Sequence, residues 1–223
     1  MPVGSSNSLH ERLARKDDMR IGIDFDNTIA GYDELFVRLG QSLGWLPANF
    51  AGGKNRVVEA IRKLDDGETK WMQLQAAAYG THMDEAVLNE GVGPFLNRCK
   101  ALGIVVYVVS HKTLHATLDP GGIDLREAAM AWMSTKGFFD DAGFAMPRTH
   151  VFFEATRKEK CERIAALNCD HFIDDLEVIF LEPDFPDSVN RHLYHPGGGE
   201  LPVGPFTPYR SWKDIADGIV GQV

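Results

Sequence analysis

The stretch IGIDFDNTIAG, from Ile21 to Gly31, decides how this chain folds. It begins as an apolar strand pattern, continues into two acidic residues one position apart, and ends in a polar Asn-Thr turn. Because side chains on a strand alternate between faces, we expect Asp24 and Asp26 to project to the same side. Two carboxylates in one small volume repel each other unless a cation or a proton lies between them. A strand that ends in an Asx turn would also account for these residues, without any chemistry.

The composition is that of an ordinary globular protein. The 223 residues are 44% hydrophobic and 25% charged, enough for one substantial domain or for a core domain with a smaller insertion. A net charge of −9 disfavours binding of a nucleic acid polymer over a broad surface. The three cysteines show no C-x-x-C spacing, which fits a reducing cytoplasm. No apolar run approaches the roughly 20 residues that span a bilayer, so we expect no membrane partner.

Four short apolar runs followed by polar residues are typical of buried parallel strands. They lie at 21–25, 104–109, 150–153 and 171–173, and a weaker fifth run lies at 191–194. Helical patterns precede the second, third and fourth runs. This alternation predicts right-handed crossovers and an α/β fold with an open, mostly parallel Rossmann-like sheet and helices on both of its faces.

A long segment interrupts this alternation after the first strand. From residue 32 to residue 91 it offers helical patterns and no convincing strand, and a connection of this length is better explained as a subdomain than as a loop. We therefore predict a helical insertion at 32–91 and a core made of 20–31 and 92–223. Residues 1–19 are expected to be a flexible lead-in, because they lack the apolar run of a signal peptide.

Polar side chains follow the predicted strands at their carboxyl ends. They are Asp24, Asp26 and Thr28 after the first strand, Ser110 after the second, and Asp174 and Asp175 after the fourth. The helix before the fourth strand begins near TRKEK, at 156–160. Ligands of open parallel sheets bind at this edge, so we expect acids, a hydroxyl and a lysine to converge there.

This ordered set resembles the haloacid dehalogenase-like (HAD) superfamily over about residues 20 to 180. The superfamily pattern is D-x-D-x-T on the first strand, Ser or Thr after the second, Lys before the fourth and acids after it. The lone Ser and Lys are weak signals, whereas the ordered set is strong. The resemblance implies a phosphatase that requires Mg²⁺, carries an inserted helical cap and acts on a small phosphorylated metabolite.

The resemblance also implies a role for each matched residue. Asp24 would attack phosphorus to form an aspartyl-phosphate, and Asp26 would protonate the leaving group and then activate water. Ser110 would donate to a phosphoryl oxygen, and a lysine would neutralise its charge. The Mg²⁺ ligands would be Asp24, the backbone carbonyl of Asp26, Asp174 and, directly or through an intermediate contact, Asp175.

Three lysines are candidates for the neutralising role. We prefer Lys160 to Lys158, because Thr156 can cap the helix and Lys160 then lies beside the apolar face that carries Ile164. Lys112 is a weaker third candidate.

Five residues are candidate substrate contacts. Caps of the superfamily select substrates, and the stretch WMQLQAAAYG lies in the inserted segment, although a helix with Trp, Leu and Ala at these spacings is more often simply packed core. His111 lies next to Ser110, yet adjacent side chains on a strand point to opposite faces. The five are Thr28, His111, Trp71, Gln75 and Tyr79. The stretch AGGKN at 51–55 lacks the G-x-x-x-x-G-K-[ST] pattern of a phosphate loop, and we assign it no function.

Two alternatives to a phosphatase stay open at this point. Transfer of the phosphoryl group to an acceptor other than water would use the same intermediate, and a regulatory protein could bind phosphate without turnover. Dehalogenases and phosphonatases of the superfamily lack an acid at the second position of the D-x-D motif. The presence of Asp26 at that position argues against these two activities. The short spacing from the lysine to FIDD resembles deoxyribonucleotidase-like members, so nucleotides and sugar phosphates are both candidate substrates. Neither the substrate nor the oligomeric state follows from the sequence.

Overall fold

The computed structural model describes residues 18–118 and 121–221. Its core is a six-stranded sheet in which every neighbouring pair is parallel. In spatial order the strands are β5 (Val151–Glu154), β4 (Val105–His111), β1 (Arg20–Ile23), β6 (His171–Asp174), β7 (Asn190–Tyr194) and β8 (Thr207–Tyr209). The predicted α/β class is confirmed, while β8 is an additional edge strand. Most of the predicted lead-in, residues 1–17, lies outside the described residues.

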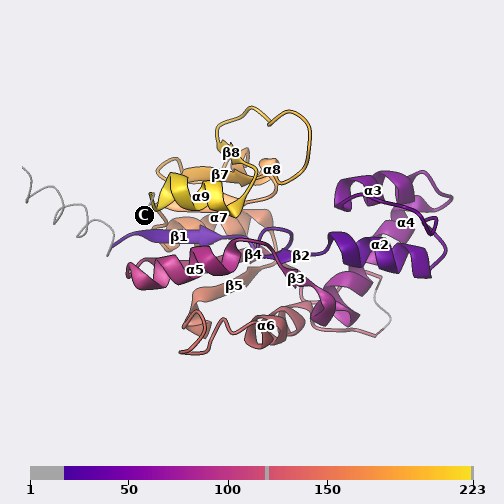
Figure 1. Ribbon diagram of the computed structural model, residues 1–223, viewed down its shortest axis with the longest axis horizontal. Helices are drawn as coiled ribbons and strands as arrows, with labels where there is room; N and C mark the ends of the chain where they lie inside the picture. The colour runs from indigo at the N-terminus through magenta and orange to yellow at the C-terminus, as the bar shows by residue number, and fades with distance from the viewer. Residues whose placement is uncertain (1–17, 119–120, 222–223) are drawn as a thin grey trace, which may run out of the picture.

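Helices cover both faces of the sheet, as the alternation of strands and helices predicts (Figure 1). Alternate residues of β4 divide between two apolar clusters, because side chains on a strand point to opposite faces. Val106 and Val108 belong to the cluster that contains Phe95 and Trp212, and Val109 packs with Ile164 on the other face. The core helices are α5 (Val92–Ala101), α6 (Leu125–Thr135), α7 (Arg157–Ala166), α8 (Glu177–Phe180) and α9 (Trp212–Ile219), with a 3₁₀ turn η3 (Arg148–His150) before β5.

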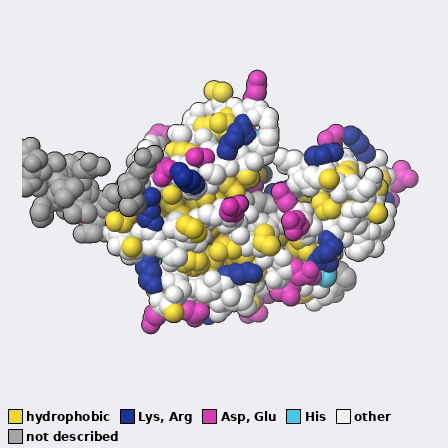
Figure 2. Space-filling model, viewed as in Figure 1, with side chains coloured by type: hydrophobic (Ala, Val, Ile, Leu, Met, Phe, Trp, Pro, Cys, Tyr) yellow, Lys and Arg dark blue, Asp and Glu magenta, His cyan; other side chains and the backbone are white. Residues whose placement is uncertain are grey.

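The segment at 32–91, called the helical segment below, lies to one side of the sheet (Figures 1 and 2). Two short strands, β2 (Ala30–Gly31) and β3 (Val87–Leu88), pair antiparallel where the segment leaves and rejoins the core. Between them lie α2 (Asp33–Ser42), α3 (Lys54–Arg62), α4 (Gly67–Ala76), the π-helical η1 (Ala77–Thr81) and the 3₁₀ turn η2 (Met83–Glu85). The helical patterns expected in this part of the sequence thus correspond to α2, α3 and α4 with η1. Within the described residues, none of the helices combines the length and apolar character needed to cross a membrane.

Two histidines face each other between β6 and β7, away from the acidic strand ends. His171 Nδ1 lies 2.9 Å from His192 Nε2. His192 is 6% exposed, and within the described residues its Nδ1 is buried without a hydrogen-bond partner. Burial and the neighbouring His171 lower the pKa of His192 to about 3. The folded protein therefore keeps this ring neutral at ordinary pH.

We expect His192 to make the protein less stable as the pH falls. The unfolded chain protonates this residue near its ordinary pKa of 6.5, whereas the folded chain does so only near 3, so protons bind the unfolded state preferentially between these values. The expected loss in the free energy of unfolding at pH 5 is about 2 kcal/mol. Urea unfolding between pH 7.5 and pH 5 should show a shallower pH dependence for His192→Gln. His195→Gln, a nearby histidine outside the pair, should keep the wild-type slope, and equal slopes for both variants would contradict the assignment.

Candidate active site

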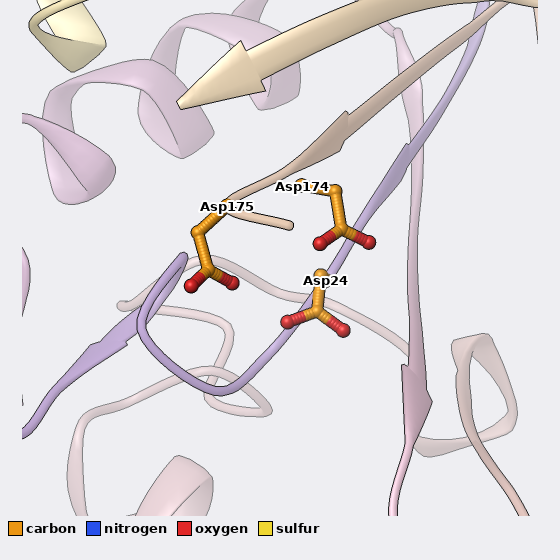
Figure 3. A group of neighbouring side chains, drawn as sticks. All are labelled: Asp24, Asp174 and Asp175. Atoms are coloured by element: carbon orange, nitrogen blue, oxygen red, sulfur yellow. The ribbon is translucent and has the colours of Figure 1, made fainter. Parts of the chain in front are cut away.

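Three carboxylates lie together at the carboxyl ends of β1 and β6 (Figure 3). One oxygen from each of Asp24, Asp174 and Asp175 lies within 4.8 Å of the other two. The two strands are parallel neighbours, and their ladder continues as Asp24 N–H donates to the Ile173 carbonyl at 2.8 Å. The residues that follow the strands therefore emerge at one edge of the sheet. Three oxygen donors at this spacing could hold a hard cation such as Mg²⁺.

Lys160 joins two of these carboxylates. Its Nζ lies 2.6 Å from Asp24 Oδ1 and 2.6 Å from Asp174 Oδ2, and the residue is 1% exposed. Burial alone would lower the pKa of Lys160, but the charges of Asp174 and Asp24 outweigh that effect and raise it. The ammonium group therefore stays protonated between the two acids.

The start of α7 explains why Lys160, and not Lys158, lies in the site. Thr156 caps the helix by accepting from the Glu159 N–H, and the Glu159 carboxylate accepts in return from Thr156 N–H. This capping box fixes the first turn and turns Lys160 inward. The Lys158 side chain is 67% exposed and lies 3.9 Å from Glu162.

Burial makes the charged form of the acids costly. It raises the pKa of Asp174, and Lys160 offsets only part of this increase. It likewise raises the pKa of Asp175, with a partial offset from Lys54. A divalent cation would favour the charged form of both groups, so the donor set fits a metal ion by its chemistry as well as by its spacing.

The carboxylate of Asp26 has partners of its own. Lys112 Nζ lies 2.8 Å from Asp26 Oδ2, and the Tyr32 hydroxyl donates to Oδ1 at 2.6 Å. β1 ends at Ile23, two residues before the predicted end, so strand alternation does not extend to Asp26. Lys160 pairs with Asp24, and Lys112 pairs with Asp26. From the sequence alone, Lys112 is only the third candidate for the lysine that neutralises the phosphoryl charge.

The two predicted hydroxyl residues differ in position. Ser110 is 1% exposed and precedes the last residue of β4, the neighbour of β1. Thr28 is fully buried, and its Oγ1 donates to Asp175 Oδ1 at 3.3 Å. The observed partner of the Thr28 hydroxyl is thus Asp175, and Thr28 as a substrate contact stays a prediction.

A cavity of about 250 Å³ lies beside Asp26, between the helical segment and the core. Its walls include three of the predicted substrate contacts, Gln75, Tyr79 and His111. His111 Nε2 lies 3.0 Å from the Ala155 carbonyl, which ties its ring to the turn after β5. These three side chains could therefore meet a ligand that occupies the cavity.

Trp71 is not part of the wall of this cavity. It is 5% exposed and packs against Phe36 with ring centroids 5.1 Å apart. Leu74 and Ala78 share its face of the helix, while Gln75 lies on the side that reaches the cavity. The prediction that Trp71 contacts substrate is corrected, and the alternative of a packed core residue holds.

Two residues near the acids were not found from the sequence. Tyr32 follows β2 directly at the N-cap of α2, and its hydroxyl donates to Asp26. Lys54 lies in the stretch AGGKN, which lacks a phosphate-loop pattern, yet its Nζ lies 3.8 Å from Asp175 Oδ2. The contact of Lys54 joins segments far apart in the sequence, whereas Tyr32 lies only six residues after Asp26, and no sequence motif signals either contact.

Comparisons with known proteins support this architecture. No protein-family model and no curated sequence matches the chain. A HAD family hydrolase from Deinococcus radiodurans R1, with bound phosphate and sodium, is similar with a TM-score of 0.54 and 12% identity, over 92% of this chain and 96% of that one. A HAD-superfamily hydrolase, subfamily IA, variant 1, from Geobacter sulfurreducens PCA gives 0.52 and 13%, over 91% and 97%.

A HAD-superfamily hydrolase from Ehrlichia chaffeensis is similar with a TM-score of 0.50 and 13% identity, over 90% of this chain and 95% of that one. At identities this low the likeness shows the fold alone, and it extends over at least nine tenths of this chain in each comparison. The strand order, the acids at the strand ends and these neighbours agree, and the chain has a HAD-like fold.

Proposed function

We propose that this chain is a Mg²⁺-dependent phosphatase that hydrolyses a small phosphorylated metabolite through an aspartyl-phosphate. The observation that carries the proposal is the position of Lys160, at 2.6 Å from both Asp24 and Asp174, with Asp175 beside them. A carboxylate nucleophile, acids for a cation and a neutralising lysine thus meet at one edge of the sheet.

Asp24 would act first. A carboxylate oxygen of Asp24 attacks phosphorus, and the bond from phosphorus to the ester oxygen breaks. Lys160 and Ser110 bind phosphoryl oxygens as charge develops on them. Asp24, Asp174 and Asp175, with the backbone carbonyl of Asp26, would hold Mg²⁺, which supplies further neutralisation of the phosphoryl charge.

Asp26 would move the proton in both halves of the reaction. It gives a proton to the departing ester oxygen and then takes one from the water that hydrolyses the aspartyl-phosphate. Lys112 and the Tyr32 hydroxyl both contact this carboxylate and hold it in place for the two proton transfers. Burial raises the pKa of Tyr32 well above its ordinary value, so its hydroxyl stays a donor that orients Asp26.

The helical segment would select the substrate as a cap. The cavity beside Asp26 lies between α4 with η1 and the end of β4, where the leaving group of a phosphate ester would lie. Gln75 and Tyr79 contribute polar groups from the helical segment, and His111 contributes one from the core. Contacts to this remote part of the substrate distinguish one ester from another.

A screen of phosphorylated metabolites tests the proposal. The chain should release phosphate from at least one small monoester with Mg²⁺ and should stop when a chelator removes the ion. Transfer to an added alcohol in preference to water would identify a phosphotransferase instead. Binding of phosphate esters without any turnover would identify a binding protein.

Asp174→Asn is expected to raise the Mg²⁺ concentration needed for half-maximal activity by about 10-fold to 100-fold, because one charged ligand is lost at constant volume. The measurement is activity against Mg²⁺ concentration. Asp187→Asn is the matched control, since the Asp187 side chain is fully exposed and pairs with Arg191. An unchanged Mg²⁺ requirement in Asp174→Asn would show that the ion is held elsewhere.

A further inference from the structure

Lys54 brings a positive charge from the helical segment to the carboxylate cluster. Its Nζ lies 3.8 Å from Asp175 Oδ2, too far for a hydrogen bond, and its side chain is 22% exposed. Lys160, by contrast, is 1% exposed and already has two carboxylates at hydrogen-bond distance. An ammonium group has three N–H donors, so Lys54 can donate to a further partner, whereas Lys160 has one donor left beyond its two carboxylates.

The start of α3 fixes where Lys54 lies. Its backbone N–H donates to Asp33 Oδ1 on α2 at 2.7 Å, which joins the two helices at this point. A Cβ on Gly53 would lie 2.5 Å from Asp33 Oδ2, so a side chain there would displace the carboxylate that holds Lys54. The stretch before α3 thus presents Lys54 in one place, although it lacks a phosphate-loop pattern.

Acidic and phenolic groups surround Lys54. Its charge interacts with Tyr79, Asp175, Asp26 and Asp24. Tyr79 is also part of the cavity wall beside Asp26. Lys54 therefore lies close to both the carboxylate cluster and the cavity, and these are the two places that a phosphate ester would occupy.

We propose that Lys54 binds a non-bridging oxygen of the substrate's phosphoryl group and so couples phosphate binding to the helical segment. The inference rests on the proposed function, because it takes the anion at the cluster to be a phosphoryl group. A cation held by the three acids would compete with Lys54 for Asp175, and a phosphoryl oxygen is then the nearest new partner of suitable charge. Lys160 approaches the same anion from α7, so the two lysines hold it from different elements.

Calorimetric titration with inorganic phosphate in saturating Mg²⁺ tests the inference. Lys54→Gln should weaken phosphate binding by about 10-fold to 100-fold, the usual range for a hydrogen bond to a charged group. The KM of a hydrolysed monoester should rise by a similar factor, with a smaller change in kcat. Lys54→Arg, which keeps the charge, should lie between Lys54→Gln and the wild type. The control is Lys63→Gln near the other end of α3, where the side chain is 71% exposed and pairs with Glu59.

Several outcomes separate this inference from the proposed function. Wild-type phosphate affinity and KM in Lys54→Gln would overturn the inference, even if that variant melts at a lower temperature. A wild-type chain that binds phosphate but hydrolyses no monoester would overturn the proposed function, and a loss of phosphate binding in Lys54→Gln would still support the role of Lys54. Failure of the wild-type chain to bind phosphate would overturn the inference whatever the turnover.

Discussion

Asp24→Asn is expected to reduce kcat by about four to six orders of magnitude, the scale of effect that follows removal of a covalent nucleophile. An amide oxygen is a far poorer nucleophile than a carboxylate, and no other carboxylate shares Asp24's position at the end of β1. The substitution keeps the side-chain volume at a residue that is 5% exposed. The amide oxygen can still accept from Lys160, so the fold should persist.

The measurement is single-turnover and steady-state hydrolysis, with thermal melting to establish that the variant is folded. Glu177→Gln is the matched control, because it removes an exposed carboxylate two residues beyond Asp175. This control should hydrolyse the substrate at the wild-type rate. Near-wild-type kcat in a folded Asp24→Asn protein would remove Asp24 from the role of nucleophile.

The sheet could be predicted where strands are buried on both faces. β1, β4 and β6 have short apolar sequences because they are interior strands whose residues are mostly buried, and β5, a half-buried edge strand, is recognisable from its Val-Phe-Phe run. β8 escaped prediction because it has three residues, lies at the sheet edge and contains Pro208, which lacks a backbone donor. The two-residue strands β2 and β3 are too short to show a period of their own.

The site could be predicted where its residues directly follow strands. Asp24, Asp174 and Asp175 converge because parallel neighbours end at the same edge, and that much follows from sequence order. Lys54 could not be placed, because its contact with Asp175 depends on how the helical segment packs on the core. Tyr32 lies only six residues after Asp26, but no sequence motif marks a tyrosine there as part of the site.

The error at Trp71 has a different origin. Trp71 and Gln75 are four residues apart, and that spacing puts them near one face of a helix. The sequence does not say which edge of that face meets the cavity. The packing of Phe36 against Trp71 draws the indole into the interior of the helical segment, and Gln75 is left at the cavity wall.

Lys160→Met should impair both stability and turnover, whereas Lys158→Met should impair neither. Removing Lys160 leaves Asp24 and Asp174 facing each other in a buried site without a cation, and breaking a buried ion pair costs about 3–5 kcal/mol. Loss of a charge that neutralises the phosphoryl group should also reduce kcat by about 100-fold to 1,000-fold. The Lys158 side chain is 67% exposed, and its loss should change stability by less than about 0.5 kcal/mol.

The pH dependence separates this electrostatic effect from a simple loss of packing. Burial already raises the pKa of Asp174 in the presence of Lys160, and without the lysine that pKa must rise further. A carboxyl whose folded-state pKa is raised gains stability as the pH falls through that pKa, because the folded state then binds the proton more tightly than the unfolded state does. The stability difference between Lys160→Met and the wild type, measured by urea unfolding in chelator, should therefore be largest near pH 7.5 and shrink towards pH 5. A difference that stays constant over this range would show that Lys160 contributes through packing alone.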